Sequence, residues 1–258
     1  MRKQYCSYWL SFFCLLVGSS FLGYTQEDGS AANPEAWVEQ VFQSLSEEER
    51  IAQLIMIPAH SNKDEAYYQA TEVLIQQYNV GGLLFFQGTP ENQVALTNRY
   101  QQAAKTPLLI AMDAEWGLGM RLKDALSYPR QMTLGALRDD RLIYDMGAEI
   151  ARQLKLMGVH INFSPVIDVN NNPDNPVIGR RSFGEHKEKV AAKGIAYMQG
   201  LQDHGILAVA KHFPGHGDTS KDSHYELPII THDRERLDAL ELFPFKKAIE
   251  AGLQGIMV

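Results

Sequence analysis

The sequence predicts an α/β fold built on a parallel sheet, specifically a (β/α)8 barrel of which about six of the eight βα units are present. After the N-terminal segment, short apolar runs alternate with longer amphipathic stretches. Chemically reactive side chains follow several of these runs, at Asp113, at Asp168 and at the pair Lys211-His212. A barrel collects its chemistry from many strand ends, whereas an open sheet uses one crevice. No Gly-x-Gly-x-x-Gly or Walker motif follows any run, which argues against nucleotide binding.

Six of the apolar runs are expected to form strands, because they are short and bounded by polar or small residues. The strands are expected at residues 54–57, 82–86, 108–112, 160–163, 207–210 and 255–258. The helices are expected near residues 35–50, 64–78, 91–104, 139–157, 186–203 and 234–251. Ser46 and Glu49 have the spacing of a capping box. Gly158, Gly205 and Gly252 each stand just before a strand, as is typical of helix C-terminal caps.

The composition of the chain is that of a globular protein with a sizeable core. It has 258 residues, of which 45% are hydrophobic and 21% are charged. The net charge of −7 argues against a surface for nucleic acid or anionic lipid, so we expect neither as a partner. The last apolar run lacks a following cap or helix. We therefore expect residues 26–258 to be a barrel domain truncated at its C-terminal end, with room for a further domain fused downstream.

The first 25 residues have the pattern of a secretory signal peptide. Arg2 and Lys3 precede an apolar stretch at residues 9–23, and polar residues follow it. This stretch is too short for a stable membrane span, although an uncleaved anchor is the alternative. Both cysteines, Cys6 and Cys14, lie inside it, so the mature chain has no disulfide or thiol nucleophile. We expect a protein exported to the periplasm, the cell envelope or the medium, without a membrane span after cleavage.

Residues 211–224 contain three histidines, two aspartates and two lysines directly after an expected strand. Five of these side chains are candidate metal ligands: His212, His216, Asp218, Asp222 and His224. The His-x-x-x-His spacing suits zinc only on a helix, which Pro214 and two glycines oppose, and Lys211 repels a cation. We therefore expect no metal. A second interpretation is a polar surface loop with incidental histidines.

The third interpretation, which we favour, is a site for a neutral, polyhydroxylated ligand with proton transfer. A lysine that closes a buried strand needs a partner or a ligand, and Lys211 and His212 can both donate hydrogen bonds to hydroxyl groups. Asp222 lies two residues before His224, where it can fix the tautomer of the ring and raise its basicity. A histidine supported in this way is a competent general acid and base near neutral pH.

Two further clusters follow expected strands. Asp113 comes directly after residues 108–112, so its carboxylate is expected at the rim of the site, where it accepts hydrogen bonds from hydroxyls; a helix cap is the alternative. Trp116 offers a flat face for a sugar ring, or packs as an ordinary aromatic. After the strand at 160–163 comes a long loop rich in Asn and Pro. From it, Arg180 or Arg181 reaches back to the site or forms a surface ion pair.

Together these clusters resemble glycoside hydrolase family 3, and within it the β-N-acetylhexosaminidase branch, from about residue 45 to the end. The specific motif is Lys211-His212-Phe-Pro-Gly-His-Gly-Asp-Thr followed by Asp222-Ser-His224. The resemblance implies a (β/α)8 barrel and retaining hydrolysis that releases terminal β-linked N-acetylglucosamine. No cofactor and no metal is implied.

The resemblance also implies roles for individual residues. Five look like the residues that bind the non-reducing-end sugar: Asp113, Arg121, Arg181, Lys211 and His212. His224 looks like the general acid and base, with Asp222 as its partner, where most retaining glycosidases use two carboxyl groups. The nucleophilic Asp of the family lies beyond Val258, so we expect residues 1–258 alone to be inactive.

One departure from the family pattern concerns Trp116, which stands where the branch has a glycine. This puts the shape of the site and the leaving-group preference in doubt, but not the family. Three alternatives remain open for the function. They are a β-glucosidase of the same family, a phosphorylase of the same family, and a non-catalytic sugar-binding protein.

Overall fold

The computed structural model describes residues 33–219, 230 and 232–258. The chain divides into two compact units, residues 1–43 and residues 44–258. The first unit holds most of helix α1 (Pro34–Ser44), which has no buried residue. All other described elements belong to the second unit.

The second unit is built on six strands, all parallel, in the order β1-β2-β3-β4-β5-β6. Their order in the sheet therefore follows the order of the chain, as right-handed βα units produce. The strands are β1 (Met56–Ala59), β2 (Gly82–Phe85), β3 (Leu109–Met112), β4 (Ile161–Asn162), β5 (Leu207–Ala210) and β6 (Gly255–Ile256). Each expected strand is present, and this arrangement is an incomplete (β/α)8 barrel, as the sequence predicts.

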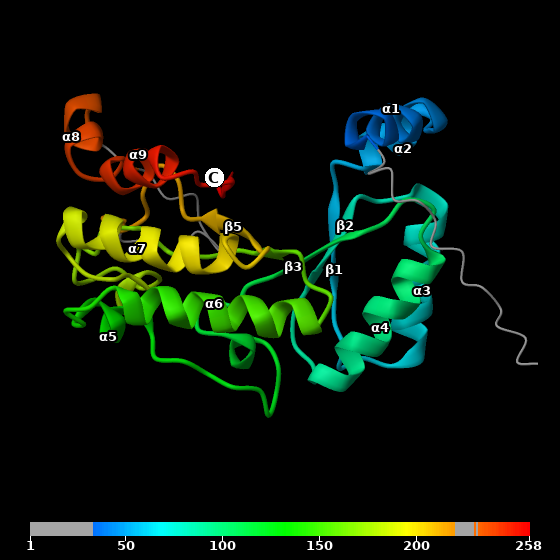
Figure 1. Cartoon of the computed structure of the whole chain (residues 1–258), viewed down its shortest axis with the longest axis horizontal. Coiled ribbons are helices and arrows are strands. Elements are labelled where there is room, and N and C mark those ends of the chain that lie inside the picture. Colours follow the sequence, from blue (N-terminus) through cyan, green and yellow to red (C-terminus); the bar gives the residue numbers. More distant parts are fainter. Residues whose placement is uncertain (1–32, 220–229, 231) are drawn as a thin grey trace, which may run out of the picture. The chain divides into compact units, whose positions relative to one another are not determined.

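Helices connect the successive strands (Figure 1). They are α3 (Glu65–Tyr78), α4 (Pro90–Ala103), α5 (Gln131–Gly135), α6 (Arg141–Leu156), α7 (Lys187–Gln202), α8 (Arg234–Ala239) and α9 (Phe243–Glu250), while α2 (Glu47–Ala52) precedes β1. Two short 3-10 helices, η1 (Leu118–Met120) and η2 (Gly179–Arg181), lie in the loops after β3 and β4. The predicted C-terminal caps Gly158, Gly205 and Gly252 have φ of 69°, 80° and 90°, a backbone conformation that favours glycine.

The expectations at residues 35–50, 54–57 and 234–251 were wrong in detail. The first segment forms two helices, since α1 ends at Ser44 and Ser46 begins α2 with the predicted capping box. Its side chain accepts from the Glu49 N–H at 3.2 Å, and the Glu49 carboxylate accepts from the Ser46 N–H at 2.8 Å. The strand begins two residues late, at Met56, because Leu54 and Ile55 form the turn after α2. The last segment also forms two helices, and Pro244, which has no N–H to donate, lies in the first turn of α9.

Apolar side chains fill the space between the sheet and the helices that cover it. Phe85, Ile110 and Met112 are fully buried there. Helices α6 and α7 lie side by side over this layer (Figure 1) and approach closely at Gly147 and Gly200. A Cβ atom at either glycine would collide with the backbone of the other helix, so both positions require glycine. This packing fixes the two helices that flank β4 and thereby the loops that follow β3 and β4.

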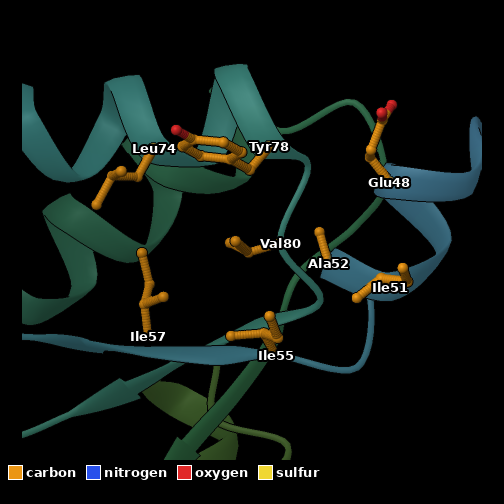
Figure 2. Close-up of a pocket in the computed structure, with 8 residues that line it drawn as sticks. All are labelled: Glu48, Ile51, Ala52, Ile55, Ile57, Leu74, Tyr78 and Val80. Atoms are coloured by element: carbon orange, nitrogen blue, oxygen red, sulfur yellow. The ribbon is translucent and has the colours of Figure 1, made fainter.

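A separate apolar hollow of about 330 Å³ lies beside β1, between α2 and α3. Figure 2 shows the side chains that line it, among them Ile55, Ile57 and Val80. Six of its eight lining residues are aliphatic, and Glu48 and Tyr78 are the two that carry a polar group. Within the described part of the chain, no helix is long and apolar enough to cross a membrane.

Candidate active site

The candidate site lies where the carboxyl ends of neighbouring parallel strands bring polar side chains together. Asp113 directly follows β3, and Lys211 directly follows β5. Parallel strands end at the same edge of a sheet, so residues 98 positions apart in the sequence come into contact. The Lys211 Nζ donates to Asp113 Oδ1 at 2.7 Å and lies 2.8 Å from Glu115 Oε1. The lysine therefore bridges two carboxylates.

Asp113 takes part in two ion pairs, one through each oxygen. While Oδ1 accepts from Lys211, Oδ2 accepts from Arg121 Nη2 at 2.6 Å. Burial opposes ionisation of this carboxyl, but the attraction of Lys211 and Arg121 outweighs it and holds the pKa of Asp113 below its ordinary value. Asp113 is thus a fixed anion at neutral pH. It joins the site through these pairs, and it caps none of the described helices.

Glu115 is the most deeply buried carboxylate that contacts Lys211, with its side chain 1% exposed. It also receives a bidentate pair of hydrogen bonds from Arg181, Nη2 to Oε1 at 2.7 Å and Nε to Oε2 at 3.0 Å. Burial raises the pKa of Glu115, but Lys211 and Arg181 lower it further, so that it falls to about 2. The pair fixes the guanidinium plane of Arg181, because fork-shaped contacts restrict its orientation.

His212 is oriented by the fully buried carboxylate of Asp168. The His212 Nδ1 lies 2.7 Å from Asp168 Oδ2, and the backbone N–H groups of His212 and His216 also donate to this carboxylate. The other ring nitrogen, Nε2, lies 3.3 Å from Arg181 Nη2. A guanidinium only donates hydrogen bonds, so Nε2 accepts and the proton of the neutral ring sits on Nδ1. Asp168 therefore determines the tautomer of His212.

The five residues expected at the sugar site from the sequence lie in one connected network. Asp113, Arg121, Arg181, Lys211 and His212 are joined directly or through Glu115. Of the two arginines in the loop after β4, Arg181 reaches the site and Arg180 is exposed. Asp222 and His224, expected as the proton-transfer pair, lie outside the described residues.

Sequence reasoning missed the role of Glu115. The signal was its position two residues after Asp113, but a carboxylate in a loop gives no local sign of its ion pairs. For Trp116, expected to face a sugar ring or to pack as an ordinary aromatic, the guanidinium carbon of Arg130 lies 3.2 Å from the centroid of its ring. One face of this ring therefore stacks on an arginine.

Asp218 belongs to a second polar cluster, which contains His232 and Glu241. One potential ligand atom from each of the three lies within 4.8 Å of the others. The His232 Nε2 is 2.6 Å from Asp218 Oδ2, and Arg236 Nη2 lies 3.5 Å from Asp218 and 3.3 Å from Glu241. The Arg236 guanidinium contacts both carboxylates and offsets one of their two negative charges.

In enzymes of this fold, the active site usually lies at the carboxyl ends of the barrel strands, which is where this ion-paired group of side chains is found. Residues 46–258 match the profile of the glycosyl hydrolase family 3 N terminal domain. The chain belongs to this family, which confirms the resemblance stated from the sequence.

Relatives and solved structures agree with this assignment. Beta-hexosaminidase A of Pseudoalteromonas piscicida is 37% identical over 198 residues, which are 72% of this chain and 33% of that protein. Beta-hexosaminidase LpqI of Mycobacterium tuberculosis is 33% identical over 218 residues, 83% of this chain and 54% of that protein. A family 3 β-N-acetylglucosaminidase structure from Paenibacillus superposes with a TM-score of 0.76 at 39% identity, covering 83% of this chain and 42% of that one. The chain thus spans between a third and about half of these proteins.

Proposed function

We propose that the protein is a retaining glycoside hydrolase that removes terminal β-linked N-acetylglucosamine, a β-N-acetylhexosaminidase. The observation that carries the proposal is the network of Asp113, Arg121, Arg181, Lys211 and His212 at the strand ends, which offers fixed donors and acceptors to sugar hydroxyls. The relatives named β-hexosaminidase and β-N-acetylglucosaminidase support the choice of sugar. The ligand proposed is a glycan that carries N-acetylglucosamine at its non-reducing end.

The network has an exposed layer and a buried layer. The side chains of Asp113, Arg121, Arg181 and His212 are between 14% and 21% exposed, so each presents an edge to a ligand. Lys211 and Glu115 are 3% and 1% exposed beneath them. An ammonium group has three donors, and Lys211 uses two on carboxylates, which leaves one for a substrate hydroxyl. The buried pair holds the exposed layer in one geometry, so little side-chain order is lost when sugar binds.

We propose that His224 is the general acid and base and that Asp222 orients it. A carboxylate outside residues 1–258 attacks the anomeric carbon, and His224 protonates the departing oxygen as the glycosidic bond breaks. In the second step His224 takes a proton from water, which displaces the carboxylate and returns the β-anomer of the sugar. Together these steps give retention of configuration, and they require no cofactor.

The test uses the full-length protein with His224→Ala and a control variant, His186→Ala. His186 is exposed and its side chain caps no backbone group. We expect His224→Ala to lower kcat by about 10²- to 10⁴-fold on N-acetyl-β-glucosaminides with poor leaving groups. Activated aryl glycosides should lose less, because their departure needs less protonation. Equal losses on the two substrates, or a similar loss in His186→Ala, would contradict the proposed role.

A second candidate is a β-glucosidase or β-glucoside phosphorylase activity. A solved structure of the beta-glucoside phosphorylase BglX bound to 2FGlc superposes with a TM-score of 0.80 at 26% identity, and a Cellulomonas fimi relative is named for both N-acetylglucosaminidase and β-glucosidase activity. Assays of glucosides and N-acetylglucosaminides with and without phosphate separate these activities. Sugar binding without turnover in the full-length protein would instead indicate a non-catalytic binding protein.

We also propose that the protein is exported after cleavage of residues 1–25, which lie outside the described residues. The resulting domain begins at residue 26. The mass of the mature N-terminal peptide from the native host tests this proposal, and a peptide that begins at Met1 would refute it.

A further inference from the structure

The backbone at Ala114 joins the two carboxylates that pair with Lys211, because Asp113 and Glu115 stand on either side of it. The regular pairing of β3 with β4 ends just before this residue, since its register runs only to Met112. The segment that carries both carboxylates therefore lies beyond the sheet ladder. Its position depends on the side chains that contact it there.

Asn162 takes the place of a strand partner for Ala114. Its Oδ1 accepts from the Ala114 N–H at 3.0 Å, and its Nδ2 donates to the Ala114 carbonyl at 3.4 Å. A side-chain amide offers a donor and an acceptor, as a peptide group does. Asn162 is the last residue of β4 and is fully buried. It therefore extends the contact between β3 and β4 beyond the last backbone pair.

Tyr197 holds the same segment from α7. Its hydroxyl lies 3.0 Å from the Ala114 carbonyl and 3.2 Å from the Glu115 carbonyl, so its one proton is shared between them. Tyr197 is fully buried, and burial raises the pKa of its hydroxyl, which keeps the proton. A Cβ atom at Gly147 of α6 would lie 2.7 Å from the Tyr197 carbonyl oxygen and 3.0 Å from its ring. The packing of α6 on α7 thus fixes the position of Tyr197.

We propose that Asn162 and Tyr197 are positioning residues for the sugar site. Their hydrogen bonds fix the backbone of Ala114, and thereby the two carboxylates on either side of it. The inference rests on the proposed function, because these two residues act on the sugar only through Asp113 and Glu115. Removal of either side chain leaves a buried backbone group without a partner, a cost that favours movement of the segment. Such a movement displaces both carboxylates, and binding is sensitive to small displacements of this kind.

The test uses Tyr197→Phe and Asn162→Ala in the full-length protein. Gln101→Ala is the matched control, because Gln101 makes the same pair of contacts at the other end of β3. Its Nε2 donates to the Leu108 carbonyl at 2.8 Å, and its Oε1 accepts from the Leu108 N–H at 2.9 Å. Leu108 directly precedes β3, so this contact lies at the opposite end of the strand from the sugar site.

We expect Tyr197→Phe and Asn162→Ala each to raise the Kd for N-acetylglucosamine about 2- to 10-fold, the equivalent of one lost hydrogen bond. The Kd is measured by calorimetry, and KM on an N-acetyl-β-glucosaminide should rise by a similar factor. The value of kcat should change less, because the proposed proton-transfer pair belongs to the segment after β5. Gln101→Ala should lower the midpoint of urea unfolding and keep the Kd of the wild type.

A wild-type Kd in Tyr197→Phe or in Asn162→Ala would overturn the positioning role of that residue and leave the proposed function standing. Equal weakening in Gln101→Ala would also overturn it, because the effect would then follow stability and not the site. So would a fall in kcat at an unchanged KM. A wild-type protein that neither binds N-acetylglucosamine nor hydrolyses its β-glycosides would overturn the proposed function, and the positioning role with it.

Discussion

Substitution of Glu115 by Gln removes the charge that Lys211 and Arg181 share. The pKa of Glu115 is about 2 against an ordinary value of 4.5, a difference that corresponds to about 3 kcal/mol of folding free energy. Its side chain is 1% exposed, so solvent screens little of this interaction. Glu115→Gln leaves Arg181 without a carboxylate pair and Lys211 with Asp113 alone. We expect the full chain to lose about 3–5 kcal/mol of stability at pH 7, as is typical when one partner of a buried pair is removed.

The pH dependence gives a second readout. Because the pKa of Glu115 is lower in the folded state than in the unfolded state, its ionised carboxylate stabilises the fold. This stabilisation is fully present above the unfolded-state pKa of about 4.5, and it is lost as the pH falls toward the folded-state pKa of about 2. The stability difference between wild type and Glu115→Gln, measured by urea unfolding, should therefore shrink between pH 4.5 and pH 2. A difference that stays constant over this range would refute the electrostatic explanation.

Glu149→Gln is the matched control. The pKa of Glu149 is also about 2, through hydrogen bonds from Arg152 and Gln153, but its side chain is 39% exposed. Exposed ion pairs contribute little, so this variant should lose less than about 1 kcal/mol. If the two variants shift the urea midpoint equally, burial does not explain the contribution of Glu115 to stability.

Two further substitutions test local structure. Ser46→Ala removes half of the capping box of α2 and should cost about 1 kcal/mol in thermal or urea unfolding; no change would mean that the cap is dispensable. Gly217→Ala places a Cβ against the carbonyl of Val169, closer than van der Waals contact allows, so the loop after β5 must shift. We expect a loss of about 1–3 kcal/mol and weaker binding of N-acetylglucosamine, measured by calorimetry, and wild-type values for both would contradict the contact.

Local rules predicted those parts of the structure that neighbouring residues determine. The glycine caps and the capping box depend on residues within one helical turn, and both were placed correctly. Asp113 and Lys211 were predicted because a parallel sheet brings strand ends to one edge, a property of the fold class. Two details were beyond such rules. The Glu115–Arg181 pair joins positions 66 residues apart, and the choice of Arg181 over Arg180 depends on the turn of η2.

The two outer strands of the sheet have a consequence for handling the protein. In the described part of the chain, β1 and β6 each pair with a neighbour on one side only, and the apolar hollow lies beside β1. Unpaired backbone groups along such an edge are templates for pairing with strands of other molecules. Apolar side chains next to the edge strengthen that tendency, because they exclude water from the new contact. Within the described residues, β1 and β6 are therefore the two edges at which pairing with a strand of another molecule is expected to begin.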